Sequence, residues 1–221
     1  MVQKRVIAID GPAGAGKSTI AKAVAKELGY LYIDTGAMYR AVGWGALQAG
    51  IAMEDEAALT ELAKNSVIEL KSTEQGYRVF WNDTDVSEAI RTPEASAAAS
   101  PVSAVLGVRE ELVPQQRRMA ARGCVVMDGR DIGTNVLPDA DCKIFLTAEP
   151  EERARRRYHE LLEKGMEVTL AEVQKDMAER DYRDSHRAHA PLKQAEDAFL
   201  LDSTGMSIPQ VVELVLQQVR G

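Results

Sequence analysis

A glycine-rich run that ends in lysine and serine is the part of this chain best suited to chemistry. Residues 11–18 have the sequence GPAGAGKS and fit the pattern G-x-x-x-x-G-K-[ST]. In this pattern, backbone N–H groups cradle phosphates, the lysine adds a positive charge for the β- and γ-phosphates, and the hydroxyl of the last residue reaches Mg²⁺. We therefore expect a nucleoside triphosphate such as ATP to be bound by Gly11, Pro12, Ala13, Gly14, Ala15, Gly16, Lys17, Ser18 and Thr19.

The segments on both sides of this loop support the interpretation. Arg5–Ile9 is a β-branched, apolar run that predicts a buried strand. Thr19–Leu28 has a helical pattern that stops at Gly29. A strand, a glycine-rich loop and a helix in this order are the context in which the pattern indicates phosphate binding, and a simple glycine-rich turn is disfavoured.

A second polar segment, DTGAMYR at residues 34–40, follows the apolar run Leu31–Ile33. Asp34 or Thr35 can cap a helix that begins there. Arg40 would then project from the second turn, from which it can turn back to an anion near the helix N-terminus. A solvent-exposed arginine is the alternative.

A third polar segment, DGRDIGT at residues 128–134, follows the strand-like run Cys124–Met127. Asp128 lies where an acidic residue organises Mg²⁺ through water, together with Ser18. Arg130 has the two-pronged donor geometry that matches phosphate. Asp131 can accept hydrogen bonds from a ribose or an exocyclic amine. The alternative is a charged turn with an internal Arg–Asp pair.

Arginine is concentrated in two later segments, although the formal net charge of the chain is -7. A charge run is often only a solvated face, but phosphoryl transfer needs a place where positive charge stabilises the transferring group. We therefore expect at least two of these arginines to be functional. The candidates are Arg153, Arg155, Arg156 and Arg157 in the first segment, and Arg180, Arg183 and Arg187 in the second.

The elements that hold these residues alternate between strand-like and helical patterns. Strands are predicted at Arg5–Ile9, Leu31–Ile33, Cys124–Met127, Lys143–Leu146 and Phe199–Leu201. Such alternation predicts an α/β fold with a parallel, doubly wound sheet, the core architecture of P-loop NTPases. Ligands are then expected at the carboxyl ends of the strands.

Two segments interrupt the alternation. Between Ser66 and Val86 the periodicity changes to two, with Asn82-Asp83 as a tight turn, which predicts a small antiparallel meander. The segment 155–180 is charged and helical, and we expect it to be a mobile lid. The predicted domains are a core at 1–63 and 100–221, a β-rich inserted subdomain at 64–99 that binds the monophosphate, and the lid within the C-terminal half of the core.

Composition restricts the partners and the location. An acidic chain with a pI of about 5.1 is a poor match for polymeric nucleic acid, which needs a basic face. The sequence has no apolar run long enough to span a bilayer, and residues 1–5 lead directly into the first strand without a signal peptide. Cys124 and Cys142 are expected to be reduced, so a cytoplasmic protein without a membrane partner is predicted.

Together these motifs resemble the bacterial cytidylate kinases of the nucleoside monophosphate kinase family. The resemblance covers essentially the whole chain. It depends on GPAGAGKST, DTGAMYR, DGRDIGT, ERARRR at 152–157 and ERDYRDSHRAHAPL at 179–192, and the last three together are far more specific than the first alone. The β-rich insertion also resembles the enlarged monophosphate-binding domain of that family.

The resemblance implies a role for each matching position. The phosphate of the monophosphate would be held by Thr35, Arg40, Arg130 and Arg187. Cytosine would be recognised by Ser100, Arg109 and Asp131, and the ribose would be contacted by Arg180 and Asp184. Arg153 and Arg157 would be lid arginines that close over the triphosphate, so the implied catalytic residues are Lys17, Arg130, Arg153, Arg157 and Arg187.

The implied reaction is direct transfer of the γ-phosphoryl group of ATP to CMP or dCMP, with Mg²⁺ as the cofactor and a monomer as the working form. Three alternatives are a small P-loop kinase with another acceptor, a nucleotide-dependent switch protein, and a P-loop protein acting on nucleic acid. The switch class usually carries an N-K-x-D motif, which this sequence lacks. The negative charge disfavours the third alternative.

Overall fold

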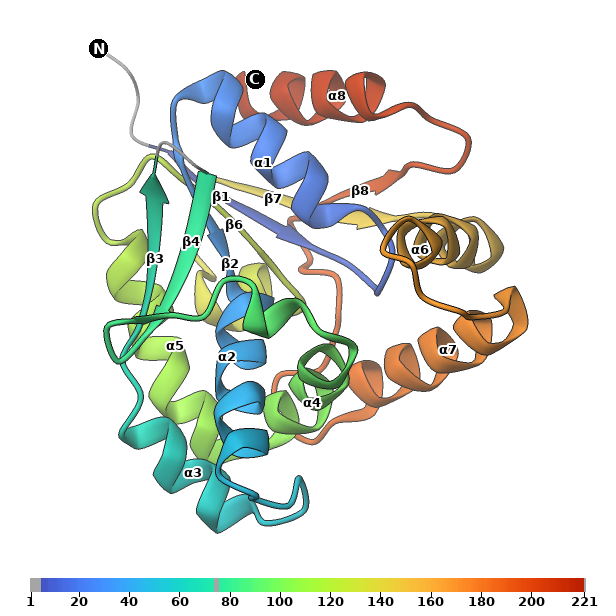
Figure 1. Cartoon of the computed structure of the whole chain (residues 1–221). Helices are drawn as coiled ribbons and strands as arrows, with labels where there is room; N and C mark the ends of the chain where they lie inside the picture. The colour runs from blue at the N-terminus through green and yellow to red at the C-terminus, as the bar shows by residue number, and fades with distance from the viewer. Residues whose placement is uncertain (1–4, 74–75, 221) are drawn as a thin grey trace. The chain divides into compact units, whose positions relative to one another are not determined.

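The computed structural model describes residues 5–73 and 76–220 (Figure 1). The chain divides into two compact units. The first comprises Met1–Tyr32 and Gly123–Gly221, and the second is Ile33–Arg122.

The first unit is built on a five-stranded sheet with the order β2-β6-β1-β7-β8. β1 pairs in parallel with β6 and β7, and β7 pairs in parallel with β8. In the sheet, β2 and β6 lie on one side of β1, and β7 and β8 lie on the other. The carboxyl end of β1 therefore lies at a topological switch point, where α/β sheets bind ligands. The predicted strands are confirmed, with bounds β1 Val6–Asp10, β2 Leu31–Asp34, β6 Val125–Gly129, β7 Cys142–Thr147 and β8 Phe199–Asp202.

Helices connect and cover this sheet. α1 and α8 lie side by side against one face, where α1 contacts β6 and α8 contacts β7 (Figure 1). α6 and α7 pack against each other, with the turn between them at Gly165, whose φ is 75°. The bounds are α1 Lys17–Leu28, the π-helical turn η2 Ile132–Val136, α6 Pro150–Glu163, α7 Leu170–His186 and α8 Ile208–Arg220.

The second unit combines helices with a small antiparallel sheet of order β3-β4-β5. The turn between β4 and β5 has positive φ at both Asn82 (46°) and Asp83 (66°), which is the type I′ hairpin geometry that these residue types favour. The predicted meander is therefore confirmed. The bounds are α2 Thr35–Gln48, α3 Glu56–Lys64, β3 Ile68–Thr73, β4 Gly76–Trp81, β5 Thr84–Asp85, η1 Ala89–Arg91, α4 Pro93–Ala104 and α5 Leu106–Ala120.

Small residues on α2 set the packing of the second unit. A Cβ at Gly43 would lie 2.9 Å from the Cβ of Ala98 on α4, and a Cβ at Gly45 would lie 2.9 Å from the ring of Trp81. Trp81 also meets Trp44 edge to face, with ring centroids 5.5 Å apart. The close approach of α4 and the meander to α2 thus depends on these two glycines.

The compact unit Ile33–Arg122 is larger than the insertion predicted at 64–99. It includes α2, α3, α4 and α5, and its core contains apolar residues of all four helices as well as of the meander. The meander therefore belongs to a larger compact unit, and residues 64–99 do not form a separate one. Within residues 5–73 and 76–220, none of the helices has the length and apolar character needed to cross a membrane.

Candidate active site

The glycine-rich loop joins β1 to the N-terminus of α1. Gly11 has φ 151°, and a Cβ there would lie 1.9 Å from the carbonyl oxygen of Leu146, so only glycine fits. Lys17 is buried, and its Nζ donates to the carbonyl oxygen of Pro12 at 2.7 Å. Burial and the neighbouring charge of Arg130 lower the pKa of Lys17, against the opposing effect of Asp128. An anion bound beside the loop would favour the charged lysine.

Ser18 and Asp128 meet where α1 begins and β6 ends. The Ser18 hydroxyl donates to Asp128 Oδ2 at 3.0 Å, and the Tyr32 hydroxyl donates to Asp128 Oδ1 at 2.8 Å. Within the described residues, no group of three or more His, Cys, Asp or Glu side chains could hold a metal ion. Two adjacent oxygen donors fit Mg²⁺, which keeps several waters and takes phosphate oxygens as further ligands.

Arg130 links the loop after β6 to α7. Its Nε donates to Asp184 Oδ2 at 2.9 Å, and the Asp184 side chain is only 6% exposed. Burial opposes ionisation of Asp184, but the charges of Arg130, Arg180 and Arg187 outweigh it and lower its pKa. The structure therefore brings four of the predicted site residues into one cluster in the first unit.

Asp131 pairs with Arg187 instead of with its neighbour Arg130. Arg187 Nη2 donates to Asp131 Oδ1 at 2.9 Å, and both side chains are almost fully buried. Asn135 donates to the other oxygen of Asp131 at 3.0 Å. The two charges of this segment are thus paired with α7 and with the residue after it, and the alternative of a turn closed by an internal Arg–Asp pair is wrong.

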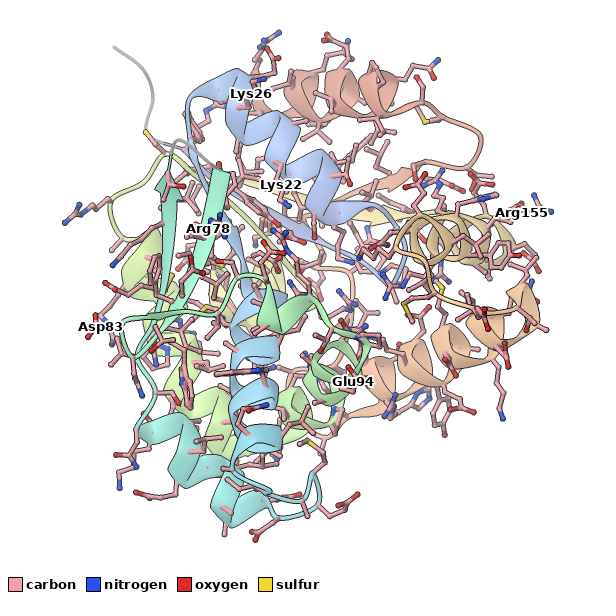
Figure 2. All side chains as sticks on the ribbon, in the orientation of Figure 1. Lys22, Lys26, Arg78, Asp83, Glu94 and Arg155 are labelled. Carbon is pink, nitrogen blue, oxygen red and sulfur yellow. The ribbon has the colours of Figure 1, made fainter. Side chains whose placement is uncertain are left out.

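The arginines of α6 have different surroundings. Arg153 is buried and donates to the carbonyl oxygens of Ala148 and Ala13 and to Asp181. Arg157, one turn later, is 30% exposed and pairs with Glu160 at 2.8 Å. Figure 2 shows Arg155 extending outward from the same helix. Of the two predicted lid arginines, only Arg157 has substantial exposure in this structure.

Four predicted site residues lie in the second unit, namely Thr35, Arg40, Ser100 and Arg109. Asp34 caps α2 by accepting from the N–H of Ala37 at 2.9 Å, and Arg40 turns back to Asp34 at 2.9 Å. Thr35 begins the helix and is 3% exposed. Asp34 is thus the cap, and the anion that Arg40 reaches in this structure is the capping carboxylate.

Ser100 on α4 and Arg109 on α5 are both buried. The Ser103 hydroxyl donates to the carbonyl oxygen of Ser100 at 2.8 Å, and Arg109 donates to the carbonyl oxygen of Ser103 at 3.3 Å. The Arg109 guanidinium also lies 5.8 Å from the centre of the Tyr39 ring. Ser100 and Arg109, which sequence patterns alone did not single out, are therefore joined through Ser103.

Asp10 is a functional candidate that the sequence analysis missed. It ends β1 immediately before Gly11, is 5% exposed, and accepts from the N–H groups of Ile132 at 2.8 Å and Gly133 at 2.7 Å. It thereby joins the phosphate loop to the segment that carries Asp131. Its signal in the sequence was a carboxylate at the end of a buried strand, similar to Asp128, which lies one residue before the end of β6.

Comparison with known proteins identifies the family. The family model described as cytidylate kinase matches residues 7–221. A cytidylate kinase of Desulfitobacterium hafniense (strain Y51) is 56% identical, over 95% of this chain and 90% of the relative. A cytidylate kinase of Geobacillus sp. (strain WCH70) is 55% identical, over 96% of this chain and 95% of the relative.

A solved structure supports the fold independently. A gluconokinase from Sinorhizobium meliloti 1021 superposes with a TM-score of 0.53 at 14% identity, over 98% of this chain and 92% of that one. At this identity the similarity concerns the fold only.

Proposed function

The chain belongs to the cytidylate kinase family, and we propose that it transfers the γ-phosphoryl group of ATP to CMP or dCMP, giving ADP and CDP or dCDP. The observation that carries this proposal is the family match over residues 7–221, which covers the second unit, nearly all of the first and every predicted site residue.

ATP is proposed to bind with its phosphates along Gly11–Thr19. Lys17 contributes its charge to the β- and γ-phosphates. Ser18 and Asp128 would hold Mg²⁺, Asp128 through water, and the ion would neutralise charge that develops on the phosphates. The 3.0 Å contact between these two side chains, and the Tyr32 hydrogen bond that orients Asp128, support this assignment.

The contacts to the monophosphate are proposed from the family resemblance. Its phosphate would be held by Thr35, Arg40, Arg130 and Arg187, and its ribose by Arg180 and Asp184. Ser100, Arg109 and Asp131 would recognise cytosine, because a carboxylate can accept from the amino group that uracil lacks. We extend the monophosphate-binding role from 64–99 to the compact unit Ile33–Arg122, since it contains Thr35, Arg40, Ser100 and Arg109.

The transfer itself needs little covalent help from the protein. An oxygen of the acceptor phosphate attacks the γ-phosphorus in line, and the bond to the oxygen that bridges the β- and γ-phosphates breaks to release ADP. The acceptor oxygen is already anionic near neutral pH, so a strong general base is unnecessary. Lys17, Arg130, Arg157 and Arg187 would stabilise the charge on the transferring group, and closure of 155–180 would exclude water.

The same proposal includes the setting of the enzyme. We infer that it works in the cytoplasm in pyrimidine nucleotide metabolism, as a monomer, without a membrane or a nucleic-acid polymer as partner. The formal net charge of -7 supports small phosphorylated ligands over a polyanion.

An ATP-dependent assay with Mg²⁺ across CMP, dCMP, UMP, AMP and GMP tests the proposal. ADP formation should strongly favour CMP and dCMP. Asp131→Asn should reduce the preference for CMP over UMP, whereas Asp139→Asn, which changes an exposed carboxylate eight residues later, should leave it unchanged.

Turnover with a different monophosphate would refute the cytosine assignment while keeping the phosphate loop in its role. Well-folded protein that hydrolyses ATP but transfers nothing to any monophosphate would favour the nucleotide-switch alternative.

A further inference from the structure

Both backbone polar groups of Ala13, in the phosphate loop, are held by side chains from two helices. The Ala13 N–H donates to Asp181 Oδ1 on α7 at 2.9 Å. The Ala13 carbonyl oxygen accepts from Arg153 Nη1 on α6 at 2.7 Å. Arg153 Nη1 and Asp181 Oδ2 are 2.6 Å apart, which closes a ring of three contacts. We call this arrangement the Ala13 clamp.

The clamp is largely shielded from water. The side chains of Arg153 and Asp181 are 9% and 20% exposed, and Arg153 Nε also donates to the carbonyl oxygen of Ala148 at 3.0 Å. Charge-assisted hydrogen bonds are among the stronger ones in proteins, and removing one partner of a buried pair leaves an uncompensated charge. The arrangement therefore favours one position of the loop relative to the two helices.

Apolar packing acts at the same place. A Cβ at Gly14 would lie 2.6 Å from Met177 Cε on α7 and 2.9 Å from the carbonyl oxygen of Arg153 on α6. Ala13 itself packs in a small buried cluster with Ala154, Val173 and Met177. The two helices therefore lie directly against the first half of the phosphate loop.

The helix that carries Asp181 also carries residues of the acceptor side. Arg180 precedes Asp181, and Asp184 follows one turn later, where it holds Arg130. We propose that Arg153 and Asp181, which lie on either side of the segment 155–180, are positioning residues that fix the phosphate loop to the first turn of α6 and the last turns of α7, so that donor-binding and acceptor-binding groups keep a constant relation. The inference depends on the proposed function for the meaning of donor and acceptor. Arg153 then acts through Ala13, and Arg157 is the α6 arginine that reaches the phosphates.

An opposite role for Asp181 predicts a different result. A carboxylate on a loop N–H adds negative charge where phosphates bind. If Asp181 were mainly a competitor of the nucleotide, its neutralisation would tighten nucleotide binding. If it is a positioning residue, its neutralisation loosens the loop and weakens both binding and turnover.

The test compares Asp181→Asn, Arg153→Lys and the double variant with two matched controls. Glu213→Gln neutralises an exposed carboxylate on α8, and Arg220→Lys changes an exposed arginine on the same helix. Each clamp variant should lower kcat/KM for CMP by about 10- to 100-fold, because small misplacements of reacting groups have effects of this size. The kcat/KM of the double variant should be at most about 3-fold below that of the less active single variant, because the two residues act as one unit.

Two further measurements do not depend on catalysis. Hydrogen exchange of the Ala13 amide should become about 10-fold faster in Asp181→Asn, and calorimetric titration should show weaker binding of ADP. The controls should match the wild type in every measurement. Arg153→Lys keeps the charge, so it provides the folded variant if Asp181→Asn is unstable.

The inference is refuted if ADP binds more tightly to Asp181→Asn, if Ala13 exchange is unchanged, or if the two losses in kcat/KM are additive. A wild-type protein inactive on CMP and dCMP refutes the proposed function instead. The exchange and ADP measurements still decide whether the clamp holds the loop.

Discussion

The buried carboxylate of Asp10 predicts an unusual dependence of stability on pH. Burial raises the pKa of Asp10 from 3.8 to about 6, against the hydrogen bonds from Gly133 and Ile132, which favour the charged form. Asp131 raises this pKa further, and Lys17 lowers it. Between pH 3.8 and about pH 6, the native state therefore binds a proton that the unfolded chain has already released.

The direction and size of the effect follow from this difference. Because the native state holds more protons, the free energy of unfolding falls as pH rises through the window. A shift of about two pKa units at 1.36 kcal/mol each lowers the free energy of unfolding by about 3 kcal/mol. This decrease is complete once the pH is well above the folded-state pKa of about 6. About 2 kcal/mol of this loss lies between pH 4.5 and 7.5.

Urea unfolding of the wild type and Asp10→Asn across this range isolates the effect, because other groups titrate in both proteins. The stability of the wild type relative to the variant should fall by about 2 kcal/mol from pH 4.5 to 7.5. Asp202→Asn is the control, because hydrogen bonds from Thr204 lower the pKa of Asp202 below 3.8, so its stability effect arises below this range and its difference should stay nearly flat from pH 4.5 to 7.5. A difference for Asp10→Asn that stays flat or rises with pH would refute the reasoning.

Three further predictions concern the loop and its neighbours. Gly11→Ala should destabilise the protein by more than about 3 kcal/mol in urea unfolding, since its Cβ would overlap the Leu146 carbonyl, whereas Gly205→Ala, with positive φ but open space, should lose only about 1 kcal/mol. Tyr32→Phe should lose about 1 kcal/mol and require more Mg²⁺ for half-maximal activity, because Asp128 loses a buried hydrogen bond. Asp128→Asn should lower ATP-dependent kcat/KM by about 100-fold, and added chelator should abolish wild-type turnover.

The sheet and the phosphate loop were predictable because local chemistry determines them. Parallel strands covered on both faces need continuous apolar runs, and the observed β1 and β6 begin and end within two residues of the predicted runs. Gly29 ends α1 with φ 67°, and Asn82-Asp83 forms the hairpin turn. At each of these positions, the residue type restricts the backbone without help from distant parts of the chain.

The pairing of the charged residues was not predictable to the same extent. Asp10 and Gly133 are 123 positions apart, and Ala13 and Arg153 are 140 apart. The arginines of α6 are chemically identical in the sequence, and only the packing against the loop distinguishes the buried Arg153 from the exposed Arg155. A local pattern carries no information about which partner a long, flexible side chain finds.

The border of the second unit escaped prediction for a related reason. The meander is visible because its period of two differs from the helical period around it. α2 and α5 have the same helical period as α1 and α8, so no change of pattern marks Ile33 or Arg122. The border is defined by which helices pack together, and that depends on close contacts such as the one at Gly43.

The ion pairs of the first unit explain how several arginines of an acidic chain can lie close to one another. Arg130, Arg153 and Arg187 are each matched with a carboxylate within 2.9 Å, which limits their mutual repulsion. Lys17 differs, because burial and Arg130 disfavour its charge more than Asp128 favours it. The phosphates of ATP would add negative charge beside Lys17. Part of the binding free energy of the nucleotide then comes from favouring the charged form of Lys17, the form that stabilises the transferring group.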